Sequence, residues 1–190
     1  MKRFTQHEGI AAPLIIDSID TDQIIPSREI KRVSKEGLGE GLFAGWRTDG
    51  EFVLNQPRYK DASILLGGKN FGCGSSREHA VWALLDYGFR VVIAESFGRI
   101  FHRNCARNGL LAIELPAAQI AAITDLVFVD LENCEIRTPG GDVFAFNVRE
   151  ADRHMLLNGL DFIEFTLQHA SSIDAFAVID RKKRPWAWRS

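Results

Sequence analysis

Residues 62–94 read ASILLGGKNFGCGSSREHAVWALLDYGFRVVIA, and this stretch decides the fold class. Its two apolar runs, 62–66 and 90–94, have the length and composition of buried strands. Between them, 77–87 has the apolar spacing of a helix, and Gly88 is predicted to end it. A strand, a helix and a strand in this order predict two parallel strands joined by a right-handed crossover.

The same alternation continues towards the C-terminus. We expect a second helix over 97–107 with Ile100 facing inward, a third strand over 110–115, and a third helix over 116–124 opened by a proline. The resulting order, βαβαβα, predicts an α/β fold with a parallel sheet.

The spacing of apolar residues changes on either side of this βαβαβα unit. We predict a strand over 9–16 and mostly loop over 27–58 before it. After it we predict three strands over 126–131, 134–137 and 142–148, and helices that begin at the capping-box patterns Asn147…Glu150 and Asp161…Glu164, with Ser171-Ser172 breaking the last helix. We therefore expect a single domain over 1–190, with a long loop at about 27–58 and a C-terminal helical tail at about 161–190.

The composition is that of a globular protein. The 190 residues include 23 Lys and Arg against 25 Asp and Glu, and the net charge is −2, which argues against a nucleic-acid binder. No apolar run reaches the roughly 20 residues that span a bilayer, and the first residues make a poor signal peptide. Three widely spaced cysteines do not form a disulfide framework. We expect a cytoplasmic protein.

The segment 67–79 carries the candidate chemistry, because it joins the first buried strand to a helix N-terminus. Ligands bind at the carboxyl ends of strands in open parallel sheets, and four glycines let the backbone approach a ligand closely. The helix start offers unpaired N–H groups, and Arg77 offers a planar guanidinium, so the segment favours an anion. Cys73 and Gly74 stand where a P-loop requires Lys and Ser or Thr, so a nucleotide phosphate loop is excluded.

Ser75 has two compatible interpretations. With Glu78 three residues later, it forms the pattern of a capping box at the start of the helix. A serine oxygen that receives backbone N–H bonds also has its anionic form favoured, which a serine acting as a base requires.

The segment 68–80, GKNFGCGSSREHA, resembles the signature of the small subunits of 3-isopropylmalate dehydratase, relatives of the aconitase C-terminal domain. The resemblance covers nearly the whole chain. It continues in DTDQIIP (20–26), GLGEGLF (37–43), FVLNQPRY (52–59), WALLDYGFR (82–90) and NGLD (158–161).

This resemblance implies a three-layer β/β/α swivelling domain that pairs with a large subunit holding a 4Fe-4S cluster. The reaction it implies interconverts 2- and 3-isopropylmalate by dehydration and rehydration in leucine biosynthesis. By position, the resemblance implies that Ser75 is the base that moves the carbon-bound proton. The other residues implied are contacts of the dicarboxylate substrate (Asn70, Ser76, Arg77, Ile30 and Lys31) and an Asp20-Thr21-Asp22 motif near the site or the subunit interface.

The sequence departs from the family pattern in the segment after Pro26, which is expected to determine which substrate side chain is accepted. After Pro26-Ser27-Arg28 the family pattern has an aromatic residue and a leucine, whereas this chain has Glu29-Ile30-Lys31; Gly98-Arg99 is a further departure. Two alternatives stay open: a paralogous small subunit that acts on another C3-substituted malate, such as methyl- or dimethylmalate, and a non-catalytic carboxylate-binding module.

Other sites are less well supported by the pattern. Cys73, Cys105 and Cys134 lack the close spacing of cluster ligands, and His102 with Cys105 lacks a second pair at zinc spacing. We therefore expect no metal and no cofactor in this chain. The tail over 181–189 mixes cations with tryptophan; we interpret it as a solvated end or a subunit contact rather than an RNA-binding segment.

Overall fold

The computed structural model describes residues 1–30 and 36–188. Seven strands form one sheet in the order β4-β3-β2-β1-β5-β6-β7. The strands are β1 (Gln6–Leu14), β2 (Ile64–Gly67), β3 (Val91–Ala94), β4 (Leu111–Glu114), β5 (Leu126–Asp130), β6 (Glu135–Arg137) and β7 (Val143–Ala145). The helices are α1 (Thr21–Ile24), α2 (Glu78–Tyr87), α3 (Arg99–Asn108), α4 (Ala117–Ala122), α5 (Glu150–Asn158), α6 (Phe162–Leu167) and α7 (Ala170–Lys183).

The predicted parallel unit is confirmed. β1, β2, β3 and β4 pair in parallel, whereas β5, β6 and β7 continue from β1 as an antiparallel extension. Gly88 and Gly109 are the C-cap residues of α2 and α3. The first strand differs from the prediction, since it begins at Gln6 and ends at Leu14.

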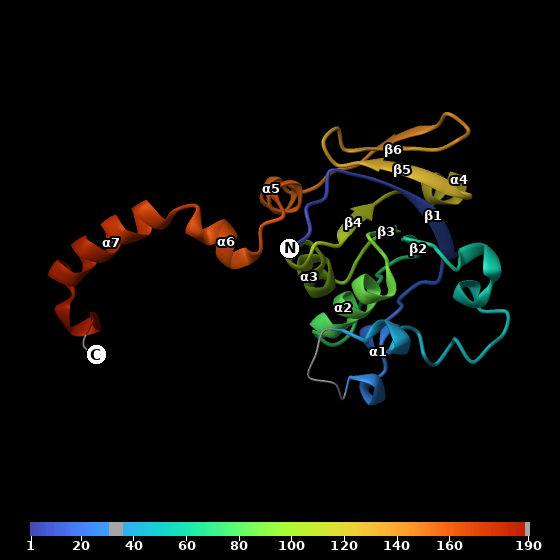
Figure 1. Cartoon of the computed structure of the whole chain (residues 1–190), viewed down its shortest axis with the longest axis horizontal. Coiled ribbons are helices and arrows are strands. Elements are labelled where there is room, and N and C mark those ends of the chain that lie inside the picture. The colour runs from blue at the N-terminus through green and yellow to red at the C-terminus, as the bar shows by residue number, and fades with distance from the viewer. Residues whose placement is uncertain (31–35, 189–190) are drawn as a thin grey trace.

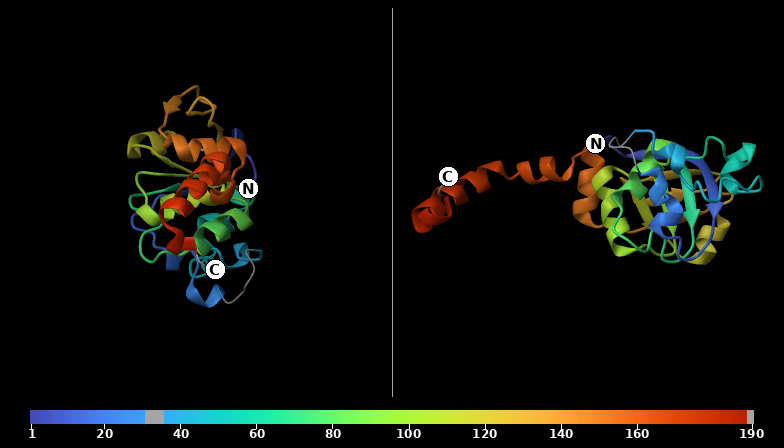
Figure 2. Two further views of the ribbon diagram at one scale, coloured as in Figure 1. Left: turned by 90° about the vertical axis from the view of Figure 1, so that its left-hand side faces the viewer. Right: turned by 90° about the horizontal axis from the view of Figure 1, so that it is seen from below.

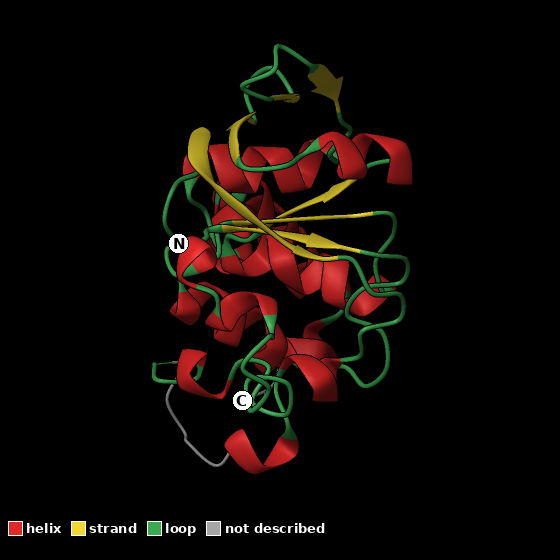
Figure 3. Cartoon of the chain, turned by 90° about the vertical axis from the view of Figure 1, so that its right-hand side faces the viewer, coloured by secondary structure: helices red, strands yellow, loops and turns green. Residues whose placement is uncertain are grey.

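Two hydrophobic cores lie on opposite faces of the parallel strands. In β2, Leu65 faces one core while Ile64 and Leu66 face the other, because successive side chains of a strand point to opposite sides. The first core lies against α2 and α3, and the second lies against β5, β6, α4 and α5. Figure 1 shows the antiparallel strands on one side of the parallel strands and α2 and α3 on the other, and Figure 3 shows that helices lie on both sides of the parallel strands. The predicted three-layer β/β/α fold is confirmed.

The segment predicted as a long loop is irregular but contributes to the first core. In its described residues, 27–30 and 36–58, four short 3-10 turns begin, and Leu38, Leu42, Phe43 and Leu54 are buried. The turns are η1 (Ser27–Glu29), η2 (Gly39–Gly41), η3 (Val53–Asn55) and η4 (Pro57–Tyr59).

Three local predictions are wrong. Ile100 is 50% exposed rather than inward-facing. The Asn147…Glu150 pattern is not a capping box, because α5 begins at Glu150 and its N-cap residue, Arg149, makes no side-chain cap. The last helix is not broken at Ser171-Ser172: both serines lie in the first turn of α7, and the interruption falls at 168–169. The capping box at Asp161 and Glu164 is confirmed.

None of the helices within 1–30 and 36–188 has the length and the apolar composition needed to cross a membrane.

Candidate functional site

The glycine loop, residues 68–77, is held on both sides by backbone hydrogen bonds. Gly72 N donates to Ile19 O at 2.7 Å, on the segment that follows β1. Phe71 N donates to Ser96 O at 2.9 Å, on the segment that follows β3. The loop is therefore fixed between the ends of β1 and β3, the two strands that flank β2. The sequence predicts the site at this edge of the sheet.

Two glycines are required by close packing of this loop against the start of α3. Gly72 has φ +73°, and a Cβ built on it would lie 2.2 Å from the Phe101 ring. A Cβ on Gly98 would lie 2.5 Å from the carbonyl oxygen of Gly72. Both separations are far below van der Waals contact, so a side chain at either position would push the loop away from α3.

The end of the loop presents unpaired hydrogen-bond donors. Among the described residues, the backbone N–H groups of residues 74–77 donate no hydrogen bond. The Ser75 hydroxyl likewise has no hydrogen-bond partner there, and the residue is exposed. Consecutive free N–H groups with a left-handed glycine, here Gly74 at φ +85°, form a concave site that favours an anion.

Ser75 does not cap the helix, so the capping-box interpretation is wrong. α2 begins at Glu78, its N-cap residue is Arg77, and no side chain caps it. The Glu78 carboxylate is engaged elsewhere, because Oε1 accepts a hydrogen bond of 2.7 Å from Asn108 Nδ2. The Ser75 hydroxyl therefore has no role in capping α2.

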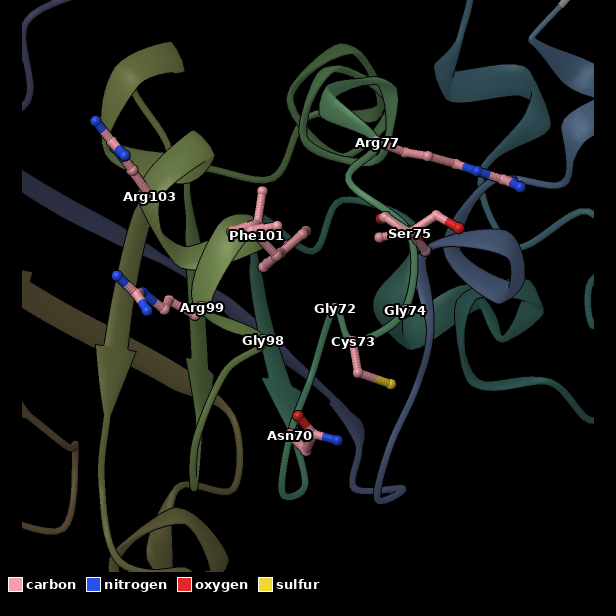
Figure 4. Close-up of a pocket in the computed structure, with 12 residues that line it drawn as sticks. Asn70, Gly72, Cys73, Gly74, Ser75, Arg77, Gly98, Arg99, Phe101 and Arg103 are labelled. Carbon is pink, nitrogen blue, oxygen red and sulfur yellow. The ribbon is translucent and has the colours of Figure 1, made fainter.

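A cavity of about 520 Å³ opens beside the loop, and we call it the loop cavity. Figure 4 shows Ser75 and Arg77 on one side of it and the first turns of α3 on the other. It is lined by Thr21, Asn70, Gly72, Cys73, Gly74, Ser75, Arg77, Gly98, Arg99, Ile100, Phe101 and Arg103.

Arg77 is paired with the carboxylate of Asp22. Its Nη1 donates to Asp22 Oδ1, which also accepts from Ser27 N at 3.1 Å and from Ser27 Oγ at 2.9 Å. Hydrogen bonds from Arg77 and then from Ser27 lower the pKa of the Asp22 carboxyl, so it stays ionised. One carboxylate therefore ties the guanidinium to the first turn of the irregular segment.

A second cavity of about 410 Å³, the side cavity, shares Arg77 with the first. Its other lining residues are Ser27, Ile30, Ser76 and His79. Glu29 does not line it: the Glu29 carboxylate pairs with Arg28 at 3.0 Å, and its side chain packs towards Gly41. The charge of Glu29, the residue that differs from the family pattern, thus points away from the side cavity. Ile30 gives this cavity an apolar surface.

The structure divides the predicted site residues between these cavities. Thr21, Asn70 and Ser75 line the loop cavity, Ile30 and Ser76 line the side cavity, and Arg77 lines both. Asp20 has a structural role, because its Oδ1 caps α1 by accepting from Asp22 N and Gln23 N. Lys31 lies outside the described residues.

The first turns of α3 were not predicted as part of the site. Arg99, Ile100 and Arg103 line the loop cavity, whereas in the sequence Arg99 stands out only as a departure from the family pattern. The signal was present in the topology: parallel strands bring the loop after β3 to the same edge as the loop after β2.

Known proteins with similar sequences identify the family of this chain. A model of the aconitase C-terminal domain family matches residues 1–118. A protein of Cupriavidus necator, named 3-isopropylmalate dehydratase small subunit, is 55% identical over 98% of this chain and 98% of its own length. The chain belongs to the family of 3-isopropylmalate dehydratase small subunits.

Further relatives agree with that membership. A small subunit of the same name from Dinoroseobacter shibae is 48% identical, over 98% of this chain and 100% of its own. The crystal structure of 3-isopropylmalate dehydratase from Methanocaldococcus jannaschii superposes with a TM-score of 0.71 at 30% identity, covering 90% of this chain and 99% of that one. The predicted resemblance is confirmed.

The cysteines of this family member do not form a metal-binding group. In the described part of the chain, no three His, Cys, Asp or Glu side chains lie together in a way that could hold a metal ion. Cys105 is fully buried, and burial raises the pKa of its thiol well above the usual value, so it stays protonated.

Proposed function

We propose that the chain is the small subunit of a 3-isopropylmalate dehydratase, which interconverts 2- and 3-isopropylmalate by dehydration and rehydration in leucine biosynthesis in the cytoplasm. The observation that carries the proposal is the free Ser75 hydroxyl, which lies at a cavity beside four unpaired backbone N–H groups and Arg77. Family membership makes this reaction the natural use of that arrangement.

In this proposal Ser75 removes and returns the carbon-bound proton of the substrate. A proton next to a carboxylate is very weakly acidic, so its removal builds negative charge that fixed donors must stabilise. Arg77 and the N–H groups of residues 74–77 supply those donors. Ser76 and Asn70 complete the binding of the dicarboxylate, and Thr21 fixes the loop, since its Oγ1 donates to the Ser75 carbonyl oxygen at 3.0 Å.

The side cavity is suited to the alkyl group of the substrate. Ile30 gives an apolar contact and Arg77 stands between the two cavities, so a molecule with a carboxylate and a branched alkyl group can reach both. Because Glu29 is turned towards Gly41, its charge does not oppose an isopropyl group there.

A large subunit completes the site in this proposal. Three large apolar side chains, Ile15, Ile16 and Ile100, are 47–52% exposed near the loop-bearing edge of the sheet, as expected for a surface covered by another chain. The 4Fe-4S cluster that the family implies would be held by that large subunit and would act as the Lewis acid for the departing hydroxyl.

Reconstitution tests the proposal. The chain is mixed with its cognate large subunit under anaerobic, iron-replete conditions, and formation of isopropylmaleate from 2-isopropylmalate is followed. We expect turnover only when both chains are present. Absence of turnover in the reconstituted complex would contradict the proposal.

The two alternatives give different results in parallel assays. A paralogous subunit would turn over methyl- or dimethylmalate faster than isopropylmalate when the substrates are compared side by side. A carboxylate-binding module would bind its ligand tightly as an isolated chain, whereas a half-site is expected to bind weakly until the large subunit is added. Calorimetry on the isolated chain separates these outcomes.

A further inference from the structure

The last helices form an arm that extends away from the rest of the molecule. We define the arm as residues 162–188, which comprise α6, α7 and η5 (Pro185–Trp188). Figures 1 and 2 show it projecting from the end of α5. At its root, the Arg107 guanidinium lies 4.7 Å from the Phe162 ring centroid, and His154 Nε2 lies 3.1 Å from Gln168 Oε1.

The arm carries most of the exposed large apolar side chains of the described residues. Nine of the fourteen lie on it, and Phe176 is 60% and Trp186 is 67% exposed. The full set on the arm is Phe162, Ile163, Leu167, Ile173, Phe176, Val178, Ile179, Trp186 and Trp188. A 14-residue helix is marginal on its own in water, and an apolar surface of this extent marks an interaction site.

The end of the arm is already ordered by its own contacts. Asp180 accepts hydrogen bonds from Arg184 Nε at 2.7 Å and from Trp188 Nε1 at 2.9 Å, and the Arg181 guanidinium lies 4.8 Å from the Trp188 ring centroid. This network folds η5 back onto the last turns of α7. A partner would thus receive a preformed surface, which lowers the entropy lost on binding.

The charge pattern favours a protein over a lipid surface. The cations of the arm gather at one end, in the run 181–184, rather than along the polar face of α7. Interfacial helices instead carry cations along one face and apolar residues along the other. Val178 also lies on the far side of α7 from Ile173 and Phe176, so the helix is suited to a groove that surrounds it.

The arm leaves the domain far from the candidate site. Its root is next to Gly159, which contacts the N-terminal residues, and Met1 in turn contacts Gly109 at the end of α3. The loop cavity lies at the opposite end of α3, at Gly98 and Arg99. The arm can therefore bind a partner without entering the catalytic cavity.

The relatives indicate which partner this is. The Cupriavidus necator protein, named a small subunit, matches 98% of this chain, a share that includes most of the arm. A chain named a small subunit has a large subunit, and the described arm has no counterpart surface within its own chain.

We propose that the arm is a tether that seats in an apolar groove of the large subunit, with an acidic rim facing the cations of 181–184. This inference rests on the proposed function for the identity of the partner. Because a tether holds the two chains together without contributing to the cavity, it governs affinity for the large subunit and leaves the chemical step unchanged.

The test compares two full-length triple variants of α7, one that removes apolar side chains and one that removes polar side chains. Ile173→Ala, Phe176→Ala and Ile179→Ala together remove the apolar side chains while keeping a strong helix former at each position. The control, Ser171→Ala, Ser172→Ala and Asp174→Ala together, removes polar side chains from the same helix. The Kd for the purified cognate large subunit is measured by calorimetry, and turnover is measured at saturating large subunit.

We expect the apolar-face variant to raise Kd roughly 10- to 100-fold, as loss of several buried anchors does, and to reach wild-type turnover at saturation. The control is expected to stay within about twofold of wild type. An unchanged Kd in the apolar-face variant overturns the proposal. So does arm-dependent self-association of the isolated chain, or arm-dependent binding to anionic phospholipid vesicles, with no change in Kd for the large subunit.

Calorimetry keeps this result separate from the proposed function. If the wild-type chains bind but do not turn over isopropylmalate, the proposed reaction fails while the tether is still tested by Kd. If the wild-type chains do not bind, the tether itself is wrong. Thermal unfolding of each variant checks that the domain is intact, since the substituted side chains are exposed and outside both cores.

Discussion

At the scale of single residues, the site depends on which groups are paired and which are free. The Ser75 hydroxyl and the N–H groups of 74–77 have no partner among the described residues, whereas Arg77 is paired with Asp22. In the proposed reaction the free groups can bind the substrate directly. The Arg77 guanidinium would instead contact both Asp22 and a substrate carboxylate.

Ser75→Ala separates a catalytic role from a structural one. If Ser75 is the base, the variant is expected to lower kcat of the reconstituted enzyme roughly 10²- to 10⁴-fold. Its unfolding temperature should stay unchanged, because the hydroxyl makes no hydrogen bond that folding would lose. Steady-state kinetics and thermal unfolding measure the two effects. Ser76→Ala, in the side cavity, is the matched control and should raise KM more than it lowers kcat.

Asp22→Asn tests the role of the ion pair. The amide keeps an acceptor for Ser27 but loses the charge that holds Arg77, and charge-assisted hydrogen bonds are about twice as strong as neutral ones. We expect KM for isopropylmalate to rise about tenfold with a smaller change in kcat, because the guanidinium is less well positioned. Asp61→Asn, at an exposed carboxylate with no partner among the described residues, should have no effect.

A lower KM in Asp22→Asn would contradict this role. It would show that Asp22 competes with the substrate for Arg77 instead of positioning it. Both results are measured in the same titration of substrate against the reconstituted enzyme.

At the scale of elements, the glycine loop and α3 form one packed unit. The loop cavity keeps its shape because Gly72 lies against the Phe101 ring and Gly98 lies against the backbone of the loop. A side chain at Gly72 would adopt a left-handed conformation and overlap Phe101 at the same time. The packing of two elements, rather than the loop alone, therefore sets the position of Ser75.

Gly72→Ala is expected to destabilise the protein by ~1–3 kcal/mol, as overpacking of a tight site does, and to reduce turnover because the loop is displaced. Gly45→Ala is the matched control, since nothing lies within 4 Å of a Cβ there and its φ is not left-handed. Denaturant unfolding measures the difference. Equal stability of the two variants would show that the loop yields to Phe101 without cost.

The elements were predictable from the sequence where burial dictates the pattern. The apolar runs that became β2, β3 and β4 are fully or largely buried, so their hydrophobicity revealed them. The start of α2 was mispredicted because Ser75 and Glu78 fit a capping box by spacing alone. The carboxylate of Glu78 instead bonds to Asn108, 30 residues away, and spacing cannot reveal such a tertiary contact.

At the scale of the whole molecule, the site is predictable only once the topology is known. Arg99, Ile100 and Arg103 are distant from Ser75 in sequence, and they meet at one cavity because the order β3-β2-β1 places three strand ends side by side. The ion pair between Asp22 and Arg77 has the same origin, since the segment after β1 lies beside the loop after β2. The glycine-loop residues were found by motif, whereas their neighbours required the fold.

Unlike α5, the described part of the arm packs on neither hydrophobic core. α5 contributes Leu156 to the second core, whereas all of α7 apart from Ala177 and Asp180 is exposed, and Asp180 is covered by Arg184 and Trp188 of the arm itself. A chain that ends at residue 169 keeps both cores and the contacts at the root of the arm. Its stability should therefore equal that of the full chain, although its affinity for the large subunit should not.

Removing residues 170–190 is thus expected to leave the unfolding temperature within about 2 °C of the full chain, because it removes no buried core contact. Leu156→Ala in the full chain is the contrast, and it should cost ~2–5 kcal/mol, as truncation of a buried leucine does. Scanning calorimetry of the isolated chains measures both. A loss from the shortened chain as large as that from Leu156→Ala would mean that the arm packs onto its own domain in solution, and a surface buried in that way could not also receive the large subunit.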